Sequence, residues 1–514
     1  MPNASLEIHV INVSQGDSIL VVNRDMDKLR QKVSTLSGAP SEPMDFLPFS
    51  DKKNLDLYGT VTQALLIDGG DECYGPSVVD YLRGVGVLPA NPAGPDPVYV
   101  RELAVLMSHH HSDHVAGLRA VHQKAVPKPP PQPTAVKKNK KKGSQKKTVL
   151  PQVTWQEYYR PGAVYRPEDD SRKLTDRESY YRLLLRYLAE ASSAKPPTPT
   201  EVHMLSPGGL TLGAPTTINL GDAGTGNNRL PITVHVLGSA QGIWDATNNK
   251  LVTIDNRVLD QNDRSVILMV EYGSFRFFTA GDIGGNGQAA GGNTGNNAAS
   301  PANKKWFSVH GDVETKLGPL LEERFPATTA TKGSPKQQSS GCCTVLKVSH
   351  HGSNSSTDVH FLATLRPEIA LISSGLRPRF YHHPTQEVMN RLDHKKQSPS
   401  WQIRGSNPPA ATPNTICGVY VTEIADLVDG NPFPLDRWDA KVVGDIVVRP
   451  TDESVWAVQN AQAAQLEELE VWVHGSRVPT EDTTAINTVC TPDTDPTKGA
   501  YYAYGPDKFK VPRH

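Results

Sequence analysis

Hydrophobic and polar residues alternate along this chain in short blocks, and this pattern predicts a protein built from many short β-strands and few helices. Apolar runs that end in a polar turn are typical of strands, whereas apolar residues spaced three or four apart indicate helices. Strands are expected over residues 6–13, 19–22, 62–67, 103–107, 265–271, 275–279, 344–348, 369–373, 417–423 and 441–448, and helices over 77–84, 115–125 and 385–392. No internal repeat is visible in the pattern.

Four polar segments interrupt this pattern and are expected to be disordered insertions at the surface. They lie near residues 24–60, 126–148, 284–303 and 327–340. The second segment is the most extreme, because it combines several prolines with eight lysines and no acidic residue, a composition that favours an extended chain. We therefore expect one domain over 1–450 that carries these insertions, followed by a C-terminal extension over 451–514 whose role the sequence does not indicate.

Composition narrows the class of protein only modestly. The chain has 514 residues, a formal net charge of −1 and 37% hydrophobic residues, enough for a sizeable core. It contains no run of about 18 apolar residues, and its N-terminus lacks a basic start followed by an apolar stretch, so we expect no membrane segment and a cytoplasmic location. The five cysteines show no CxxC pair, and we expect them to be reduced.

The lysine-rich segment 126–148 raises the question of nucleic-acid binding. Basic tracts attract the phosphate backbone through their charge. Proline-flanked lysine runs are also common in solvated loops, and no aromatic residue lies among these lysines to stack on bases. Nucleic-acid contact is therefore one interpretation of this segment, and a solvated loop is the other.

The strongest chemical signal is a cluster of imidazole and carboxylate groups directly after the apolar run 103–107. Its sequence has the form HxHxDH and contains His109, His111, Asp113 and His114. These groups are the ligands that borderline divalent metals take in proteins. Four of them within six residues would repel one another or stay unsatisfied unless they shared a cation or faced water. The spacing predicts that the two halves of the cluster reach two neighbouring metals.

Other predicted strands end in the same kind of residue. The carboxylates Asp68 and Asp282 and the histidine pairs at 350–351 and 382–383 all lie at or shortly after a strand end. Sites in layered α/β folds collect where strands stop and loops begin, so we expect one shared pocket. We interpret Asp17, in the turn at 14–18, as a turn residue that caps backbone amides.

These motifs together resemble a known superfamily. SHHHSDHVAGL, with LLIDGG before it and TAGDI and KVSHHGS after it, resembles the metallo-β-lactamase superfamily. INVSQGDSILV, LKVSHHGSNSS and HHPTQEVMNRL resemble more closely the hydrolase domain of ComEC-type DNA-uptake competence proteins, and a choline-phosphate esterase branch is similar too. The resemblance extends over roughly residues 6–450 and implies an α+β fold of the metallo-β-lactamase type, an αββα sandwich with two face-to-face sheets and helices outside.

The resemblance also implies a role for individual residues. His109 and His111 would bind a first metal, Asp113 and His114 a second, and Asp282 both. One of His350 and His351 would complete the second site, with His350 favoured because it lies nearer the strand end. Asp68 would orient a ligand from behind, His383 would lie near the leaving group, and Asn262 and Ser265 would lie at the pocket edge. The superfamily's third histidine of the first site has no clear counterpart in VHVLGSAQG, where His235 is a weak candidate.

The function that follows is metal-dependent hydrolysis, with a phosphodiester, either a small molecule or a nucleic acid, as the favoured substrate. A metal-bound hydroxide would attack phosphorus, Asp113 or Asp282 would orient it, and His383 would stabilise charge on the phosphate oxygens. Two Zn²⁺ ions suit the ligand set, and Mn²⁺ fits as well. Three alternatives stay open: hydrolysis of another ester such as a lactone, thioester or choline-phosphate ester, a non-catalytic metal-binding protein, and a nucleic-acid-binding protein.

Overall fold

The fold is described from a computed structural model. It describes residues 4–35, 56–89, 97–127, 153–157, 159–167, 200–206, 216–223, 229–239, 242–254, 261–285, 312–326, 342–375, 383–393, 401–402, 411–412, 414–423, 427–428, 431–432, 440–442, 444–450, 466–474, 480–481, 490–491 and 503–512. The lysine run, His382, the segment 327–340 and nearly all of 284–303 lie outside these residues.

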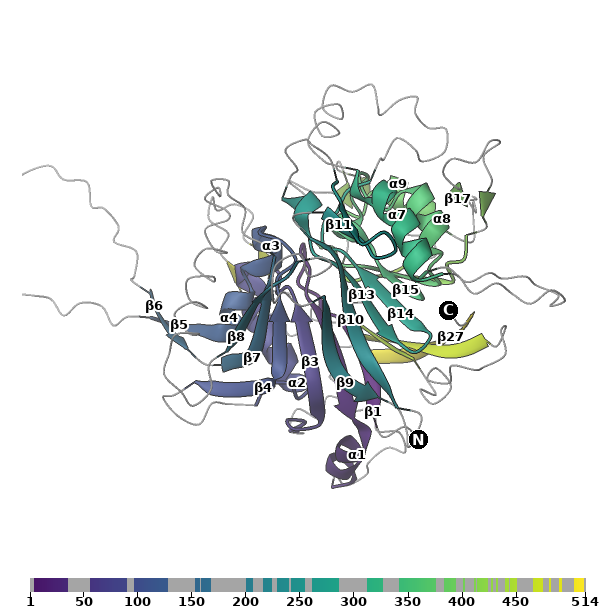
Figure 1. Ribbon diagram of the computed structural model, residues 1–514. Helices are drawn as coiled ribbons and strands as arrows, with labels where there is room; N and C mark the ends of the chain where they lie inside the picture. Colours follow the sequence, from purple (N-terminus) through teal and green to yellow (C-terminus); the bar gives the residue numbers. More distant parts are fainter. Residues whose placement is uncertain are drawn as a thin grey trace, which may run out of the picture.

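Two large β-sheets form the body of the molecule (Figure 1). The first has nine strands in the order β27-β24-β23-β1-β2-β3-β4-β7-β8. Their bounds are β1 (Ala4–Val10), β2 (Ile19–Asp25), β3 (Val61–Ile67), β4 (Val98–Leu106), β7 (Tyr159–Arg166), β8 (Glu201–Met204), β23 (Asp445–Pro450), β24 (Leu466–His474) and β27 (Ala503–Pro512). Strands β3, β4, β7 and β8 run parallel, so their carboxyl ends lie at one edge of the sheet.

The second sheet has ten strands and also contains a parallel part. Nine strands follow the order β12-β11-β10-β13-β14-β15-β16-β19-β22, and β9 pairs with β10. Strands β14, β15, β16, β19 and β22 are parallel. The bounds are β9 (Thr217–Ala223), β10 (Leu230–Ser239), β11 (Gly242–Asp245), β12 (Lys250–Val252), β13 (Ile267–Tyr272), β14 (Phe275–Thr279), β15 (Val345–Lys347), β16 (Ile369–Ile372), β19 (Gly418–Val421) and β22 (Ala440–Val442).

The remaining elements are helices and short strand pairs. The helices are α1 (Met26–Ser34), α2 (Gly75–Gly84), α3 (Ser112–Val115), α4 (Leu118–His122), α7 (Val313–Arg324), α8 (Val359–Leu365) and α9 (Gln386–Leu392), with 3₁₀ turns η2 (Glu72–Tyr74), η6 (Asn262–Arg264) and η8 (Ser349–Gly352). The small pairs are β5 (Gln123–Pro127) with β6 (Val153–Glu157), β17 (Trp401–Gln402) with β18 (Ala411–Thr412), β20 (Leu427–Val428) with β21 (Asn431–Pro432), and β25 (Thr480–Glu481) with β26 (Cys490–Thr491).

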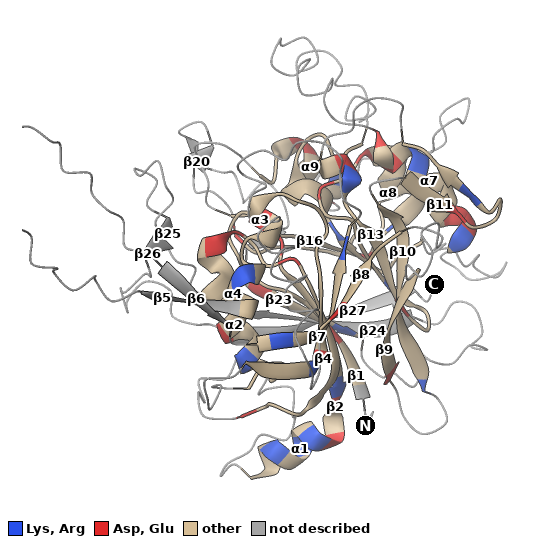
Figure 2. Cartoon of the chain, turned by 60° about the vertical axis from the view of Figure 1, so that its left-hand side comes forward, with Lys and Arg blue, Asp and Glu red and all other residues tan. Residues whose placement is uncertain are grey.

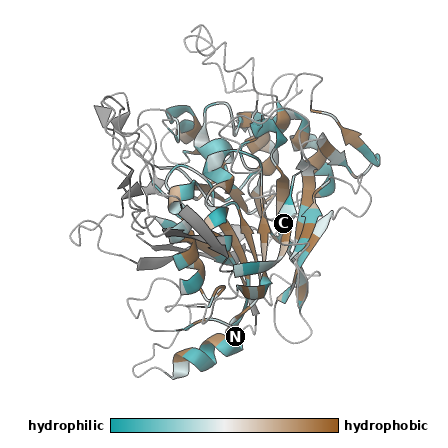
Figure 3. Cartoon of the chain, turned by 90° about the vertical axis from the view of Figure 1, so that its left-hand side faces the viewer, coloured by the Kyte–Doolittle hydropathy of each residue, from teal (hydrophilic) through white to brown (hydrophobic). Residues whose placement is uncertain are grey.

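The main hydrophobic core lies between the two sheets. Successive side chains of a strand point to opposite faces, so each strand supplies every second residue to this layer. Ile8 and Val10 of β1 pack there from the first sheet, and Phe275 and Phe277 of β14 pack there from the second. The hydrophobic colouring follows the strands in Figure 3. Burial of this many apolar side chains is the main driving force for stacking the sheets.

Two further cores attach helices to the outer faces. Residues of α2, α3 and α4 pack on the first sheet, and residues of α7, α8 and α9 pack on the second. The helices turn their polar sides outward, and α1, α4 and α7 carry charged residues in Figure 2. The order of layers is therefore helix, sheet, sheet, helix. The α+β sandwich predicted from the sequence is confirmed.

Two of the segments set apart in the sequence contribute regular elements to the fold. The segment near 24–60, expected to be an insertion, begins with α1, which buries Met26, Leu29 and Val33. The extension 451–514 contributes β24 and β27, which continue the first sheet beyond β23. Sheet pairing between distant segments leaves no local pattern in the sequence, so the contribution of β24 and β27 was not predicted. The helix α1 was missed although its buried residues Met26, Leu29 and Val33 follow helical spacing.

The cysteines also differ in part from the prediction. Cys342, Cys343 and Cys417 are free, as expected, whereas Cys73 is disulfide-bonded. A disulfide joins residues that are close in space, and sequence spacing alone does not reveal such a pair. Within the described residues, no helix is both long and apolar enough to cross a membrane.

Candidate metal centre

Loops from both sheets meet at one edge of the sandwich. The turn with Asp17 follows β1, Asp68 follows β3, and the cluster 109–114 follows β4. From the second sheet, Asp282 follows β14 and the pair 350–351 follows β15. Carboxyl ends of neighbouring parallel strands lie at the same sheet edge, which explains why residues this far apart in sequence converge.

Tight packing of glycines holds the loops of the first sheet together. Gly69 donates its backbone N–H to the carbonyl of His114 at 2.7 Å, and Gly117 donates to the carbonyl of Gly70 at 2.8 Å. A Cβ atom on Gly117 would lie 1.9 Å from the Gly69 carbonyl oxygen. Only glycine permits this approach. The turn after β3 therefore fixes the position of α3, which carries His114.

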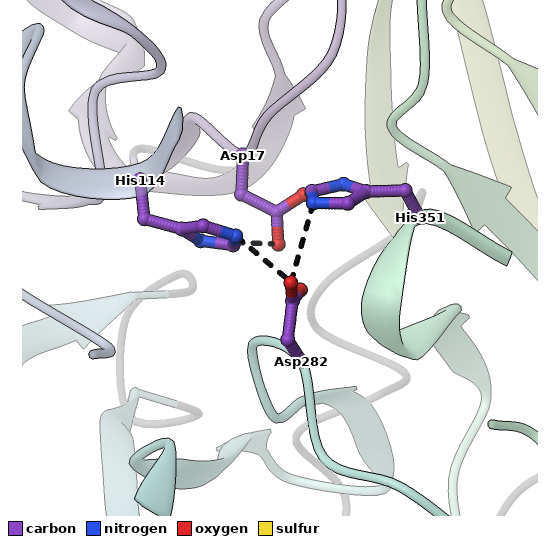
Figure 4. Close-up of side chains that lie close together, drawn as sticks. All are labelled: Asp17, His114, Asp282 and His351. Carbon is purple, nitrogen blue, oxygen red and sulfur yellow. Dashed lines mark ion pairs between the residues drawn. The ribbon is translucent and has the colours of Figure 1, made fainter. Parts of the chain in front are cut away.

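Four buried side chains form the first group of possible metal ligands: Asp17, His114, Asp282 and His351 (Figure 4). Their ligand atoms all lie within 4.8 Å of one another. The Nε2 atom of His114 is 3.3 Å from Asp282 Oδ1, and the Nε2 atom of His351 is 3.5 Å from Asp282 Oδ2. The group draws its members from both sheets.

A second group shares one residue with the first. His109, His111 and Asp282 also have ligand atoms within 4.8 Å of one another. His109 Nε2 lies 3.1 Å from His111 Nδ1 and 4.0 Å from Asp282 Oδ2. Asp282 thus has one carboxylate available to both groups. A carboxylate shared in this way is a feature of two-metal sites.

The donor atoms of the first group fit a bound cation. All four members have such an atom: Asp17 Oδ1, Asp282 Oδ1, His114 Nε2 and His351 Nε2 are buried and have no hydrogen-bond partner. Unsatisfied buried polar atoms are costly, so a cluster of them aimed at one point needs an explanation such as an ion. Imidazole nitrogen and carboxylate oxygen are suitable donors for Zn²⁺ and Mn²⁺. The residues therefore fit metal binding, and the donor types do not distinguish the metal.

Asp68 lies behind His114, on the side opposite Asp282. Its Oδ2 atom is 2.8 Å from His114 Nδ1, and its two carboxylate oxygens accept from the backbone N–H and the hydroxyl of Ser108, at 2.8 and 2.5 Å. A carboxylate bonded to one ring nitrogen fixes the tautomer and leaves the other nitrogen free for a metal. The structure thus places Asp68 where it orients a candidate ligand.

The buried carboxylates and imidazoles of the centre shift one another's pKa. Burial raises the pKa of Asp282, but His351 and His114 lower it well below its ordinary value of 3.8. Burial lowers the pKa of His351, whereas Asp282 and Asp17 raise it to about 9. Protons on these imidazoles balance the carboxylates when no cation is bound. A metal would replace those protons.

His109 behaves differently from the other buried histidines. Burial, together with His114 and His111, lowers its pKa well below 6.5. A neutral imidazole is the form that binds a metal. The second group therefore already contains a deprotonated donor.

Four predicted site residues lie at the edge of the centre, outside both groups. Asp113 Oδ2 is 3.7 Å from His351 Nε2, and His350 Nε2 is 3.8 Å from Asp282 Oδ2. Asn262 Nδ2 is 3.4 Å from His350 Nε2. The ring of His383 is centred 5.8 Å from that of His350. The geometry thus places His351 in the first group, whereas the sequence favoured His350.

Two predicted neighbours of the pocket have clear structural partners. The hydroxyl of Ser265 accepts the backbone N–H of Asp282 at 3.1 Å, which fixes the turn that presents this carboxylate. His235, the weak candidate for a third histidine, lies on β10 with its Nε2 atom 2.9 Å from Glu271. It belongs to neither ligand group.

Sequence reasoning missed Asp17 and Lys347. Asp17 is buried in the first group and forms an ion pair with the equally buried Lys347. Burial raises the pKa of Asp17, but Lys347 and His351 lower it to about 2. The interpretation of Asp17 as a turn residue was therefore wrong in placing it outside the centre. Asp17 lies in the turn just before β2, whereas Asp68 directly follows β3, so the strand-end rule that selected Asp68 did not select Asp17.

Comparisons with known proteins add a partial similarity. No protein-family model matches the chain. Over 48 residues it is 52% identical to ComE operon protein 3 of Bacillus subtilis (strain 168). The match covers 9% of this chain and 6% of that protein. This similarity is compatible with a relation to the competence-type proteins that the motifs resemble.

Proposed function

We propose that the protein is a metal-dependent hydrolase that acts on a phosphodiester. The observation that carries this proposal is the pair of ligand groups that share Asp282 at the edge of the sandwich. Two cations held there would activate a water molecule and polarise the phosphoryl oxygen. The resemblance of the motifs to the hydrolase domain of ComEC-type proteins favours this substrate class, and the short similarity to ComE operon protein 3 is compatible with that resemblance.

The position of each residue in the centre suggests its role in the proposed reaction. His109, His111, His114 and His351 would bind the cations, Asp282 would contribute to both, and Asp68 would hold His114 in its tautomer. Asp113, with a side chain 21% exposed beside His351, would be accessible to a substrate bound at the cations. His383 is half-buried next to His350, close enough to the centre to stabilise charge on a leaving oxygen.

The proposal is tested with the purified full chain. Elemental analysis after incubation with Zn²⁺ or Mn²⁺ should find two ions per chain. The loaded protein should hydrolyse a bis-aryl phosphate or single-stranded DNA, and neither a lactone nor a thioester. Faster turnover of a lactone or a thioester would replace the phosphodiester assignment. A choline-phosphate ester is itself a phosphodiester, so preferred turnover of that ester would narrow the substrate class within the assignment. A loaded chain without any hydrolytic activity would favour a non-catalytic metal-binding protein.

Two histidine variants test whether activity comes from this centre. His111→Ala removes a member of the second group and should lose bound metal together with turnover. His235→Ala removes an imidazole that bonds to Glu271 outside both groups and should retain both. Full activity in His111→Ala would contradict the site. The cytoplasmic location and nucleic-acid contact through 126–148 stay predictions.

A further inference from the structure

The loop between β1 and β2 lies between the site residues of the first sheet and those of the second sheet. On the side of the first sheet, the backbone N–H of Asp17 donates to the carbonyl of Asp113 at 3.2 Å. The backbone N–H of Gly70 donates to the carbonyl of Asp17 at 2.9 Å. A Cβ atom on Gly16 would lie 2.2 Å from the Asp113 carbonyl oxygen, so the two turns are in direct contact.

The same loop is attached to the second sheet. The hydroxyl of Ser373, after β16, donates to the carbonyl of Gly16 at 2.6 Å. Lys347, the last residue of β15, forms its ion pair with the Asp17 carboxylate, and both side chains are fully or almost fully buried. The loop therefore joins the sheet that supplies His114 to the sheet that supplies Asp282 and His351.

The atoms that Asp17 approaches indicate how it acts. Asp17 Oδ1 is 3.3 Å from Nδ1 of His351, and Oδ2 is 4.0 Å from Nδ1 of His114. In both rings the other nitrogen, Nε2, faces Asp282. The carbonyl of Ser373 also lies 3.0 Å from His351 Nδ1, and a carbonyl only accepts, so this nitrogen carries the hydrogen. Asp17 thus lies beside the Nδ1 atoms of the two imidazoles, and one of its carboxylate oxygens is also within 4.8 Å of the Asp282 carboxylate.

We infer that Asp17 and Lys347 form a positioning pair. The pair orients His351 and sets the distance between the ligands supplied by the first sheet and those supplied by the second. Asp17 does not itself bind the metal. Lys347 holds the carboxylate in place and compensates its buried charge. Asp68 bonds to Nδ1 of His114 at 2.8 Å, and Asp17 would support the Nδ1 side of the His351 ring from 3.3 Å, where the Ser373 carbonyl accepts the ring hydrogen. This inference rests on the proposed metal centre and extends it to the turn Gln15–Ser18.

The test measures Zn²⁺ binding in Asp17→Asn, Lys347→Met and Lys347→Arg. Zinc content at saturation is measured by elemental analysis, and affinity by competition with a chromophoric chelator. Substitution of a residue that supports a metal ligand lowers metal affinity by about 10–100-fold. In Asp17→Asn and Lys347→Met we therefore expect one of the two zinc ions to bind about 10–100-fold more weakly. Lys347→Arg should recover most of the affinity, and all three should still hold two zinc ions at saturation.

Two further variants separate positioning from a general effect on folding. Arg24→Met breaks a buried ion pair with Glu7 at the opposite end of β2 and should leave the zinc affinity of the folded protein unchanged. Ser373→Ala removes only the hydrogen bond to Gly16 and should weaken zinc binding about fivefold, the equivalent of one net hydrogen bond. This milder change keeps the inference testable if the charge variants do not fold.

Each other outcome has a definite meaning. Loss of one zinc ion from Asp17→Asn at saturating metal would make Asp17 a direct ligand and overturn the inference. Unchanged affinity in Asp17→Asn and Lys347→Met would reduce the pair to a structural contact and overturn it as well. A wild-type chain that binds zinc but hydrolyses no phosphodiester would refute the proposed function alone, because the affinity series decides the role of Asp17 without any activity.

Discussion

At the scale of single residues, the backbone at His350 and His351 decides which imidazole reaches the centre. Both have positive φ, 52° and 53°, and Gly352 follows with 83°. Such values are uncommon for residues other than glycine and are often found at functional sites. They turn the chain sharply after β15. Nε2 of His351 then lies 3.5 Å from Asp282 Oδ2, whereas Nε2 of His350 lies 3.8 Å from the same oxygen and 3.4 Å from Asn262 Nδ2.

Alanine variants of this pair should therefore differ. His351→Ala removes a member of the first group and should cost one bound zinc ion. Loss of a residue that supports a ligand lowers activity by up to about 100-fold, so loss of the ligand itself should lower turnover by at least about 100-fold. His350→Ala should keep both ions, because its ring lies outside the two groups. Elemental analysis and rate measurements on both variants decide the point, and equal zinc loss in the two would show that both imidazoles bind.

The sequence identified most candidate donors because they cluster locally. His109, His111 and His114 lie within six residues after one strand, and Asp282 is an acidic residue shortly after the end of another strand. The choice between His350 and His351 depended on backbone angles that no spacing predicts. Lys347 looks like any strand residue until the packing of β15 against the loop after β1 brings it to Asp17.

A second buried ion pair, away from the centre, makes stability depend on pH. Arg24 donates to both carboxylate oxygens of Glu7, at 2.7 and 3.0 Å, and His9 lies 3.0 Å from one of them. Burial raises the pKa of Glu7, but Arg24 and His9 lower it from 4.5 to about 2. A carboxyl group whose pKa is lower in the folded state stabilises the fold above the unfolded pKa, and this contribution is lost as the pH falls.

Urea unfolding of the wild type and of Glu7→Gln measures this contribution. The lowered pKa corresponds to about 3 kcal/mol of unfolding free energy at neutral pH. The difference between the two proteins should be largest above pH 4.5 and should shrink as the pH falls toward 2. A constant difference over this range would mean that the charge of Glu7 contributes nothing.

At the scale of elements, the C-terminal strands complete the first sheet. β23 pairs with β1 on one side and with β24 on the other, where Asp445 lies opposite His474 and Pro450 opposite Leu469. Without β24, one side of β23 would present unpaired backbone groups at a sheet edge, which favours association between chains. The apolar and polar pattern predicted β23 itself, but the partner of a strand depends on distant residues.

Truncation tests this contribution. A chain that ends at Pro450 should unfold at a lower urea concentration and should associate, because each lost ladder hydrogen bond costs about 1 kcal/mol. A chain that ends at His474 keeps β24 but loses the pairing of β24 with β27, so its stability should lie between those of the full chain and of the chain ending at Pro450. Both are measured with a reducing agent present, so that the Cys73 disulfide does not contribute, by urea unfolding and light scattering. An equally stable, monomeric chain ending at Pro450 would show that β24 is dispensable.

At the scale of the whole molecule, the candidate centre is also a junction between the two sheets. Its donors come from loops after β4 on one side and after β14 and β15 on the other, so both sheets must be stacked before the donors meet. The unfolded chain lacks this arrangement. A cation that binds the assembled donors therefore binds the folded state preferentially and stabilises it by mass action.

This coupling predicts that zinc protects the protein from unfolding. At a free Zn²⁺ concentration 100 times the dissociation constant, the free energy of unfolding should rise by about 2.7 kcal/mol for each site, and a chelator should reverse the gain. Asp282→Asn removes the carboxylate shared by both groups, so zinc should stabilise this variant little or not at all. Thermal and urea unfolding with and without Zn²⁺ give the comparison. Equal stabilisation of the wild type and Asp282→Asn would place the bound zinc elsewhere, because the two proteins differ only in the residue that joins the groups.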